Sequence, residues 1–257
     1  MRFSITIVLV LIYSIGLKAQ NTYNNVHGTL ILVATGKDGI MLAVDSRLTL
    51  TDKDKTIGLV DSIDKIYTLK GFSVCYEGTG ILDSNRFLSA SFSEYNKLHR
   101  KKQSFSEAVK GYVDFMKTRY EKQLNTSLKN NAFVFAGYEN NKPHITLWTP
   151  ADGEIRFNDS DTIMECTHEK IKTYFGPYDP QSSCAQMSVQ AVKAMQRYID
   201  EDKSFAAGKP FKTIMIRPNN TTITLNNFRG KQFYTTAAFN TAINKKQITL
   251  FMIKEDN

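Results

Sequence analysis

The sequence predicts an α+β protein in which helices cover two stacked antiparallel sheets, a four-layer αββα sandwich. Along the 257 residues the expected elements follow the order strands, two helices, strands, one helix, strands, which suggests helices layered on two sheets. The composition, with 42% hydrophobic and 23% charged residues, is that of a globular protein long enough for a closed core. No internal repeat or linker divides the chain.

The first expected elements are strands. The runs TLILVATG (29–36) and GIMLAVDSRLTL (39–50) are rich in β-branched and aliphatic residues, and the turn GKDG joins them into a hairpin. A polar stretch, TDKDKTIGLVDS, follows. The runs KIYTL (65–69) and FSVCYEG (72–78) then predict two more strands. The first part of the domain is therefore predicted to be a four-stranded meander.

Helices and further strands complete the predicted order. Apolar residues recur at helical spacing over 81–98 and 105–124, and Ser104 with Glu107 forms a capping box for the second helix. Strands return within 132–157, and a third helix is expected to begin near 182–183. Strands at 211–218, 221–227 and 247–254 close the chain.

The N-terminus has the features of an export signal. Arg2 supplies the positive start, residues 3–17 form a short apolar stretch, and Ala19 is a small residue at a cleavage point. A membrane anchor is disfavoured because a spanning helix needs about 20 mainly apolar residues, and Lys18 interrupts the run first. We expect residues 1–19 to be a signal peptide, and the mature protein to be periplasmic or extracellular and free of the membrane.

Several classes of site are not indicated. The formal charge of +8 is moderate and spread along the chain, and no nucleic-acid-binding motif accompanies it. The four histidines lack metal-ligand spacing, and the three cysteines do not form an even disulfide set. We therefore expect no metal, no cofactor and no nucleic-acid partner.

The pair Gly28-Thr29 raises the functional question. Inside the chain, Thr29 would be an ordinary strand residue. A threonine exposed by cleavage after Gly28 would instead carry its own base, because a free α-amine has a pKa of about 7.7–8.0 and lies beside the hydroxyl. The sequence leaves both interpretations open.

The ordered set Gly28-Thr29, GIMLAVDSR, DKIYTL and CYEGTG resembles the β subunits of the proteasome and the N-terminal nucleophile hydrolases related to them. Asp45 stands 16 positions after Thr29, the spacing of that family. The resemblance covers about 29–227. It implies a proteasome-like sandwich over 29–257 and a short propeptide, residues 20–28, removed by cleavage after Gly28.

The resemblance also implies a site. Thr29 would be the nucleophile, Lys65 would push its amine towards neutrality and stabilise the alkoxide, and Asp45 would hold that lysine. Arg47 would help to fix Asp45, and the backbone N–H of Gly78 would meet the oxyanion. Each also has an ordinary alternative: a strand threonine, an Asp-Arg ion pair, a solvent lysine and a turn glycine.

The substrate pocket implied by the resemblance contains Leu48, Ile63 and Tyr76, so an apolar side chain is expected beside the cleaved bond. Two departures from the family pattern concern the residues around the Thr29 amine. Ser204 stands where the family has an aspartate, and the turn at Pro177 lacks the family's serine.

Two functions follow, from different classes. The first is an exported, self-processing threonine hydrolase that cleaves peptide or small amide bonds, with a homo-oligomer as one expected form. In it, Lys65 matters far more to rate than to folding. The alternative is a non-catalytic, proteasome-like binding or scaffold subunit in which Thr29 is never freed. A third interpretation is an amidase acting on a non-peptide substrate.

Overall fold

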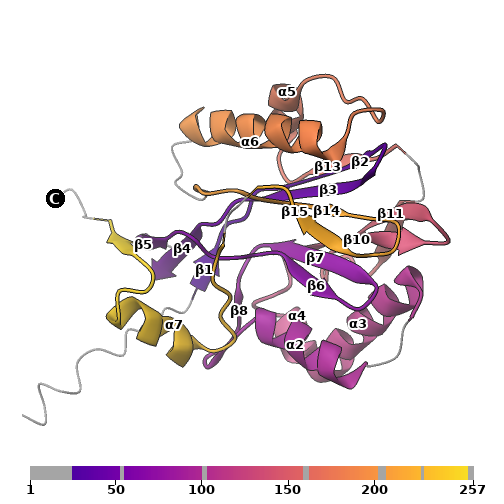
Figure 1. Cartoon of the computed structure of the whole chain (residues 1–257). Helices are drawn as coiled ribbons and strands as arrows, with labels where there is room; N and C mark the ends of the chain where they lie inside the picture. Colours follow the sequence, from indigo (N-terminus) through magenta and orange to yellow (C-terminus); the bar gives the residue numbers. More distant parts are fainter. Residues whose placement is uncertain are drawn as a thin grey trace, which may run out of the picture.

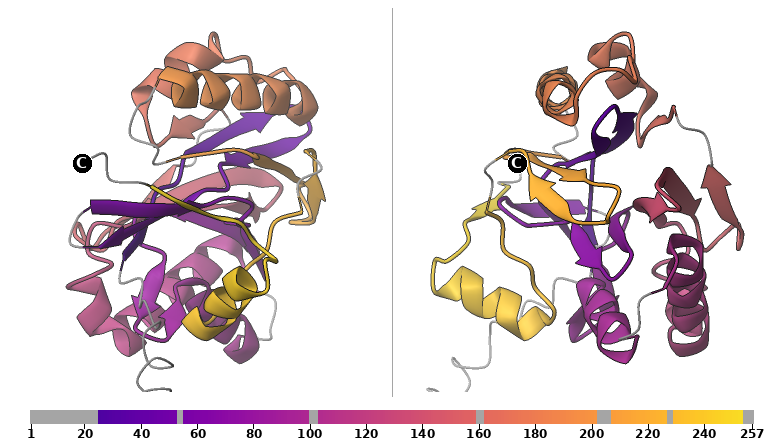
Figure 2. Two further views of the ribbon diagram at one scale, coloured as in Figure 1. Left: turned by 90° about the vertical axis from the view of Figure 1, so that its left-hand side faces the viewer. Right: turned by 45° about the vertical axis from the view of Figure 1, so that its right-hand side comes forward.

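The computed structural model describes residues 25–52, 55–99, 103–158, 162–201, 207–226 and 229–253. It confirms the four-layer αββα sandwich: two five-stranded antiparallel sheets stack face to face, and helices cover both outer faces (Figures 1 and 2). The predicted signal peptide and positions 20–24 of the predicted propeptide lie outside these ranges. Within them, no helix combines the length and apolar character needed to cross a membrane.

The first sheet has the strand order β13-β2-β3-β14-β15. Its strands are β2 (Ile31–Gly36), β3 (Gly39–Val44), β13 (Met164–Cys166), β14 (Lys212–Ile216) and β15 (Thr222–Thr224). Its outer face is covered by α5 (Glu169–Phe175) and α6 (Cys184–Glu201), and α6 buries Met187, Ala191 and Met195 there. The 3.6-residue spacing of these side chains puts them on one face of the helix.

The second sheet has the order β12-β11-β10-β7-β6. Its strands are β6 (Tyr67–Leu69), β7 (Phe72–Glu77), β10 (Ala132–Glu139), β11 (Lys142–Trp148) and β12 (Ile155–Asn158). It is covered by α2 (Ser89–Leu98), α3 (Phe105–Arg119) and the short α4 (Glu121–Leu124). The predicted capping box of Ser104 and Glu107 is present at the start of α3.

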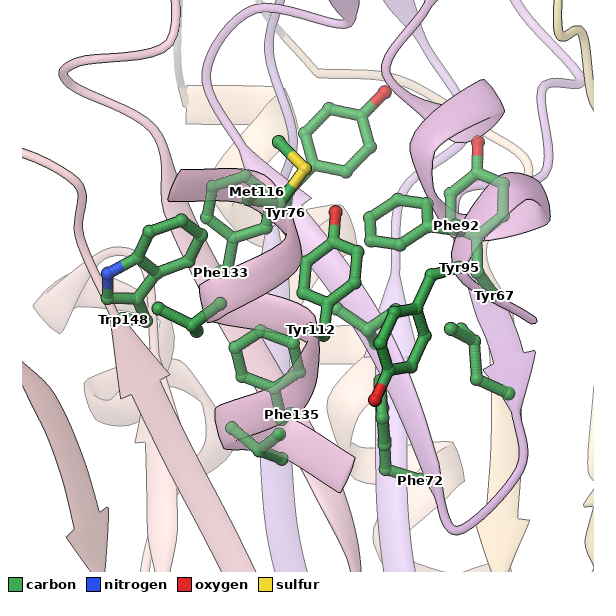
Figure 3. Close-up of a cluster of buried hydrophobic side chains, with 14 of the residues drawn as sticks. Tyr67, Phe72, Tyr76, Phe92, Tyr95, Tyr112, Met116, Phe133, Phe135 and Trp148 are labelled. Atoms are coloured by element: carbon green, nitrogen blue, oxygen red, sulfur yellow. The ribbon is translucent and has the colours of Figure 1, made fainter. Parts of the chain in front are cut away.

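An aromatic core joins α2 and α3 to the second sheet (Figure 3). Tyr112 of α3 is fully buried and contacts Phe72, Phe92 and Phe135 at ring-centroid distances of 6.5, 5.2 and 5.9 Å. A separate aliphatic core fills the space between the two sheets and includes Ile31, Val33, Val134 and Ile145. Because side chains alternate between the faces of a strand, each sheet contributes to one core on each face.

A third, smaller sheet with the order β1-β4-β5-β16 lies beside the sandwich. Its strands are β1 (Asn25–His27), β4 (Leu48–Asp52), β5 (Lys55–Val60) and β16 (Leu250–Met252). Helix α7 (Thr236–Asn244) and the pair β8 (Ile81–Asp83) and β9 (Arg86–Phe87) pack around it. The C-terminal segment therefore returns to the small sheet that contains β1.

The structure corrects three sequence predictions. The run 39–50 is not one strand: it breaks after Val44 and continues at Leu48 in the small sheet. The predicted meander is wrong because β2 and β3 belong to the first large sheet whereas β6 and β7 belong to the second. The first helix begins at Ser89 rather than at position 81, where the chain forms β8 and β9 instead.

Candidate active site

Gly28 and Thr29 lie at the junction of the small sheet and the sandwich, between β1 and β2. The Thr29 side chain is buried, and its hydroxyl donates a hydrogen bond to the carbonyl oxygen of Gly28 at 2.6 Å. The ammonium of Lys65 donates to the same oxygen at 2.7 Å. Gly28 has a φ of 98°, which an L-residue rarely adopts. The carbonyl of the bond predicted to be cleaved is thus held by the candidate nucleophile and by a cation.

Asp45 connects the elements around this point. One carboxylate oxygen accepts hydrogen bonds from Lys65 at 2.8 Å and from the backbone N–H of Leu30 at 2.9 Å. The other accepts from the backbone N–H groups of Arg47 and Gly208 at 3.0 and 3.1 Å. Asp45 is fully buried, so these four donors compensate for the loss of water around its charge.

Lys65 is buried as well, with 1% of its side chain exposed. Burial lowers the pKa of Lys65, and the favourable charge of Asp45 only partly opposes this effect. A cation with a lowered pKa beside the Gly28 carbonyl can polarise that carbonyl and can also exchange a proton. Lys65 precedes β6 and reaches the first sheet from the second, so it links the two sheets at the site.

The structure corrects the expected partner of Arg47. Its guanidinium forms a bidentate ion pair with Asp61, at 2.7 and 2.9 Å, and only its backbone N–H contacts Asp45. Asp61 raises the pKa of Arg47. A Cβ atom at Gly208 would clash with this guanidinium, so a larger residue there would force the Arg47 side chain to move. Sequence reasoning missed Asp61, although its position between β5 and Lys65 was a usable signal.

Gly78 ends β7 with a φ of 112°, and a Cβ atom there would clash with the Asn131 amide. Asn131 accepts from the backbone N–H of Thr79 at 3.0 Å and donates to the Thr79 carbonyl at 2.9 Å. Within the described ranges, no hydrogen bond from Gly78 reaches Gly28 or Thr29. Its expected role at the oxyanion stays a prediction.

The three expected pocket residues are buried in two different cores. Leu48 and Ile63 lie together in the cluster that includes Phe233 and Phe239 from the C-terminal segment. Tyr76 lies instead in the aromatic core, 6.4 Å from the ring of Tyr67. The structure therefore brings Leu48 and Ile63 together and separates Tyr76 from them, and their contact with substrate stays a prediction.

A further residue supports the strand that begins after Thr29. The hydroxyl of Thr167, just before α5, accepts from the backbone N–H of Ile31 at 3.2 Å, and the Thr167 N–H donates to the Ile31 carbonyl at 3.1 Å. Pro177 lies in the segment after α5, and Ser204 lies outside the described residues.

The residues before Gly28 are paired as an added strand. Asn25, Val26 and His27 of β1 align antiparallel with Thr51, Leu50 and Thr49 of β4. An extended segment hydrogen-bonded to a sheet edge is one of the recurring ways in which proteins bind peptides.

Among the described residues, no three His, Cys, Asp or Glu side chains are grouped as a metal site would need.

No protein-family model and no curated protein matches this chain. Solved structures of Anbu are similar in fold. The Anbu (ancestral beta-subunit) structure from Yersinia bercovieri has a TM-score of 0.58 at 12% identity, covering 85% of this chain and 96% of that chain. A Gly-1 mutant of Anbu from Hyphomicrobium sp. strain MC1 gives a TM-score of 0.56 at 14% identity, covering 86% and 96%. A helical assembly of the Anbu complex from Pseudomonas aeruginosa gives 0.55 at 12%, covering 89% and 88%.

These findings correct the family assignment made from the sequence. The chain was identified there with proteasome β subunits and related N-terminal nucleophile hydrolases, but no family model supports that membership, and the structural neighbours are Anbu at 12–14% identity. Likeness at that level of identity shows the fold alone. The chain has a proteasome-like fold that resembles the ancestral beta-subunit structures.

Proposed function

We propose that this chain is an exported, self-processing threonine hydrolase that cleaves peptide or amide bonds with Thr29 as the nucleophile. One observation carries the proposal: the Gly28 carbonyl oxygen accepts hydrogen bonds from both the Thr29 hydroxyl, at 2.6 Å, and the Lys65 ammonium, at 2.7 Å. The carbonyl is polarised by a cation, and the hydroxyl oxygen lies beside it. That arrangement suits attack on the bond between Gly28 and Thr29.

In the processing step, the Thr29 oxygen attacks the Gly28 carbonyl carbon and loses its proton. Lys65 stabilises the negative oxygen that forms, the bond from the carbonyl carbon to the Thr29 nitrogen breaks, and a proton passes to that nitrogen. Water then hydrolyses the resulting ester, which releases the Gly28 carboxylate and regenerates the Thr29 hydroxyl. The product is a chain that begins with a free Thr29 amine and hydroxyl.

In the mature enzyme the same groups act on a separate substrate. The Thr29 amine takes the proton of the hydroxyl and later returns it to the leaving amine. The buried charge of Lys65, held by Asp45, favours the neutral form of the Thr29 amine and stabilises the developing alkoxide.

The pairing of β1 with β4 suggests the substrate class. Its antiparallel alignment with β4 is how an extended peptide joined to the acyl side of the cleaved bond would lie. An exported protein has no access to ATP-driven unfolding, so we propose short peptides and small amides as substrates. Residues 1–19 are the signal peptide and 20–28 the propeptide in this proposal.

Peptide hydrolysis by variants at position 29 tests the proposal. A chain whose N-terminus is Thr29 should hydrolyse members of a fluorogenic peptide panel, and Thr29→Ser should retain activity whereas Thr29→Ala should lose it. Thr222→Ala, on the exposed strand β15, is the matched control and should behave as the wild type. Equal hydrolysis by Thr29→Ala would refute the proposed nucleophile.

A second function, a non-catalytic binding or scaffold subunit, is favoured by one observation. Thr29 is only 4% exposed, and Phe233 and Phe239 fill the space around Leu48 and Ile63. In this alternative, Thr29 stays inside the chain and Lys65 is structural.

We also propose self-association, because the Anbu complex from Pseudomonas aeruginosa forms a helical assembly. Sedimentation of the purified chain would distinguish a monomer from an oligomer.

A further inference from the structure

A cavity of about 440 Å³ lies between the two large sheets, beside β12 and β13. Its apolar walls come from the inter-sheet core on both sides, with Ile31 and Val33 from β2 and Val134 and Ile145 from β10 and β11. Leu147 is aligned with Val134 in the β10–β11 pair and therefore shares its face, yet it is 38% exposed. The inter-sheet core is thus open at this end, with room for a small organic group.

Glu77 supplies a carboxyl group to the wall of this cavity. It is aligned with Ala132, which places its side chain on the inter-sheet face of the second sheet. Burial raises the pKa of Glu77 to about 7. The nearest ionisable partner, Nε2 of His168, lies 3.8 Å from the carboxylate, which is beyond hydrogen-bonding distance. The Glu77 carboxylate therefore lacks a close cation among the described contacts.

The other charged groups around the cavity are compensated. Glu165 forms an ion pair with Lys172 of α5 at 3.4 Å, and Lys172 also contacts Glu169 at 3.2 Å. On the opposite wall, Arg156 forms an ion pair with Asp152 at 3.1 Å. These pairs are partly exposed and do not involve Glu77. Of the charged groups in the described lining of the cavity, Glu77 is the one whose nearest ion-pair contact is as long as 3.8 Å.

The cavity lies on the amine side of Thr29. Ile31, which lines it, is two positions beyond Thr29, or about 7 Å along an extended strand. The acyl side is marked by β1, which runs along β4 in the small sheet (Figure 1). The residues that line the cavity come instead from strands that include β2, β10, β11 and β13. A leaving group that continues the direction of the chain past Thr29 would reach the cavity.

We propose that this cavity binds an apolar group that carries a primary ammonium, with Glu77 as the counter-ion, and that it holds the leaving-group side of the substrate of Thr29. The first half of this proposal, binding of the ammonium group in the cavity, does not depend on the proposed function. The second half, the role of the cavity on the leaving-group side, rests on the proposed function. A cationic ligand would restore the charge of a carboxylate that burial disfavours, and its hydrocarbon part would cover the exposed face of Leu147.

Binding of hexylamine to the full chain carrying Thr29→Ala tests the first half without any turnover. Calorimetry at pH 8 should detect saturable binding of hexylamine and at least about tenfold weaker binding of 1-hexanol, the order of one hydrogen bond to a charged group. Glu77→Gln should lower the affinity for hexylamine to that for the alcohol. Glu169→Gln, which removes a charge that pairs with Lys172 outside the cavity lining, is the matched control and should leave affinity unchanged.

A second variant checks the location of the ligand. Leu147→Trp adds volume at a partly exposed cavity wall and should abolish hexylamine binding while the chain stays folded. Equal binding of hexylamine and 1-hexanol, or unchanged hexylamine affinity in either Glu77→Gln or Leu147→Trp, would overturn the proposed site.

A matched pair of amides tests the second half. The same acyl group is joined either to 1,6-diaminohexane, which leaves a terminal ammonium, or to hexylamine, which leaves a methyl group. The wild-type chain should hydrolyse the ammonium-bearing amide with a kcat/KM about tenfold higher, and Glu77→Gln should remove that preference. Equal rates in the wild type would refute the leaving-group role. If neither amide is hydrolysed although hexylamine binds, the proposed function fails and the cavity assignment stands.

Discussion

The residue pair that decides this site is Lys65 and Asp45, an ion pair with 1% and 0% of the side chains exposed. A buried pair gains little over apolar packing, but breaking it leaves one charge without a partner in a region of low polarity. Lys65 therefore has a structural role in addition to the rate effect expected from the sequence. The position of its ammonium beside the Gly28 carbonyl is the reason to retain the catalytic role.

Lys65→Ala should destabilise the fold measurably. On a Thr29→Ala background, where processing cannot differ, the free energy of unfolding in urea should fall by about 3–5 kcal/mol. The double variant Lys65→Met with Asp45→Asn, which removes both charges, should recover much of that loss. Wild-type stability of Lys65→Ala would mean that the pair is not buried in solution.

Glu77 should make stability depend on pH. Its pKa is raised from 4.5 to about 7, so the folded chain keeps a proton that the unfolded chain releases. Its contribution to stability therefore falls as pH rises from about 4.5 to about 7. Glu77→Gln should raise Tm relative to the wild type more at pH 8 than at pH 4, and Glu165→Gln should not. Parallel Tm curves for Glu77→Gln and wild type would contradict the partial burial of Glu77.

At the scale of elements, the sequence predicted those whose pattern is local. The box of Ser104 and Glu107 marks the start of α3, and alternating apolar residues mark β10 and β11. The sequence did not predict elements whose bounds depend on tertiary contacts. The break between β3 and β4 at Asp45–Arg47 occurs where Asp45 accepts hydrogen bonds from four donors. No local sequence pattern predicts these contacts.

Helix α7 was also missed, because its stability comes from distant partners. Phe239 packs against Phe87 and Phe233 at 5.2 and 5.3 Å, in the same cluster as Leu48 and Ile63. A helix of only nine residues gains its stability from such packing rather than from propensity. The C-terminal segment thus forms part of the structure around the predicted pocket.

Phe239→Ala tests this contribution. The side chain is 2% exposed, so truncation should lower the free energy of unfolding by about 3–5 kcal/mol. Thr241→Ala on the exposed side of the same helix should change stability little. A loss below 1 kcal/mol for Phe239→Ala, judged against the cost of truncating a buried phenylalanine, would show that α7 does not pack as described.

At the scale of the whole molecule, the sandwich brings distant segments to one point. The resemblance seen in the sequence implied that Thr29, Asp45 and Lys65 meet, and the structure places them together. The sequence could not indicate that Arg47 would pair with Asp61, because that contact depends on the β4–β5 hairpin that extends the small sheet. Nor could it indicate the cavity, which exists because two sheets fail to close at one edge.

The most direct test of the central claim is the intact mass and N-terminal sequence of the protein purified after expression of the full-length chain, beside its Thr29→Ala variant. Attack by Thr29 on the Gly28 carbonyl predicts a wild-type protein that begins at Thr29 and a variant that begins at Gln20. Wild-type protein that hydrolyses peptides while Gln20 is its only N-terminus would contradict the account.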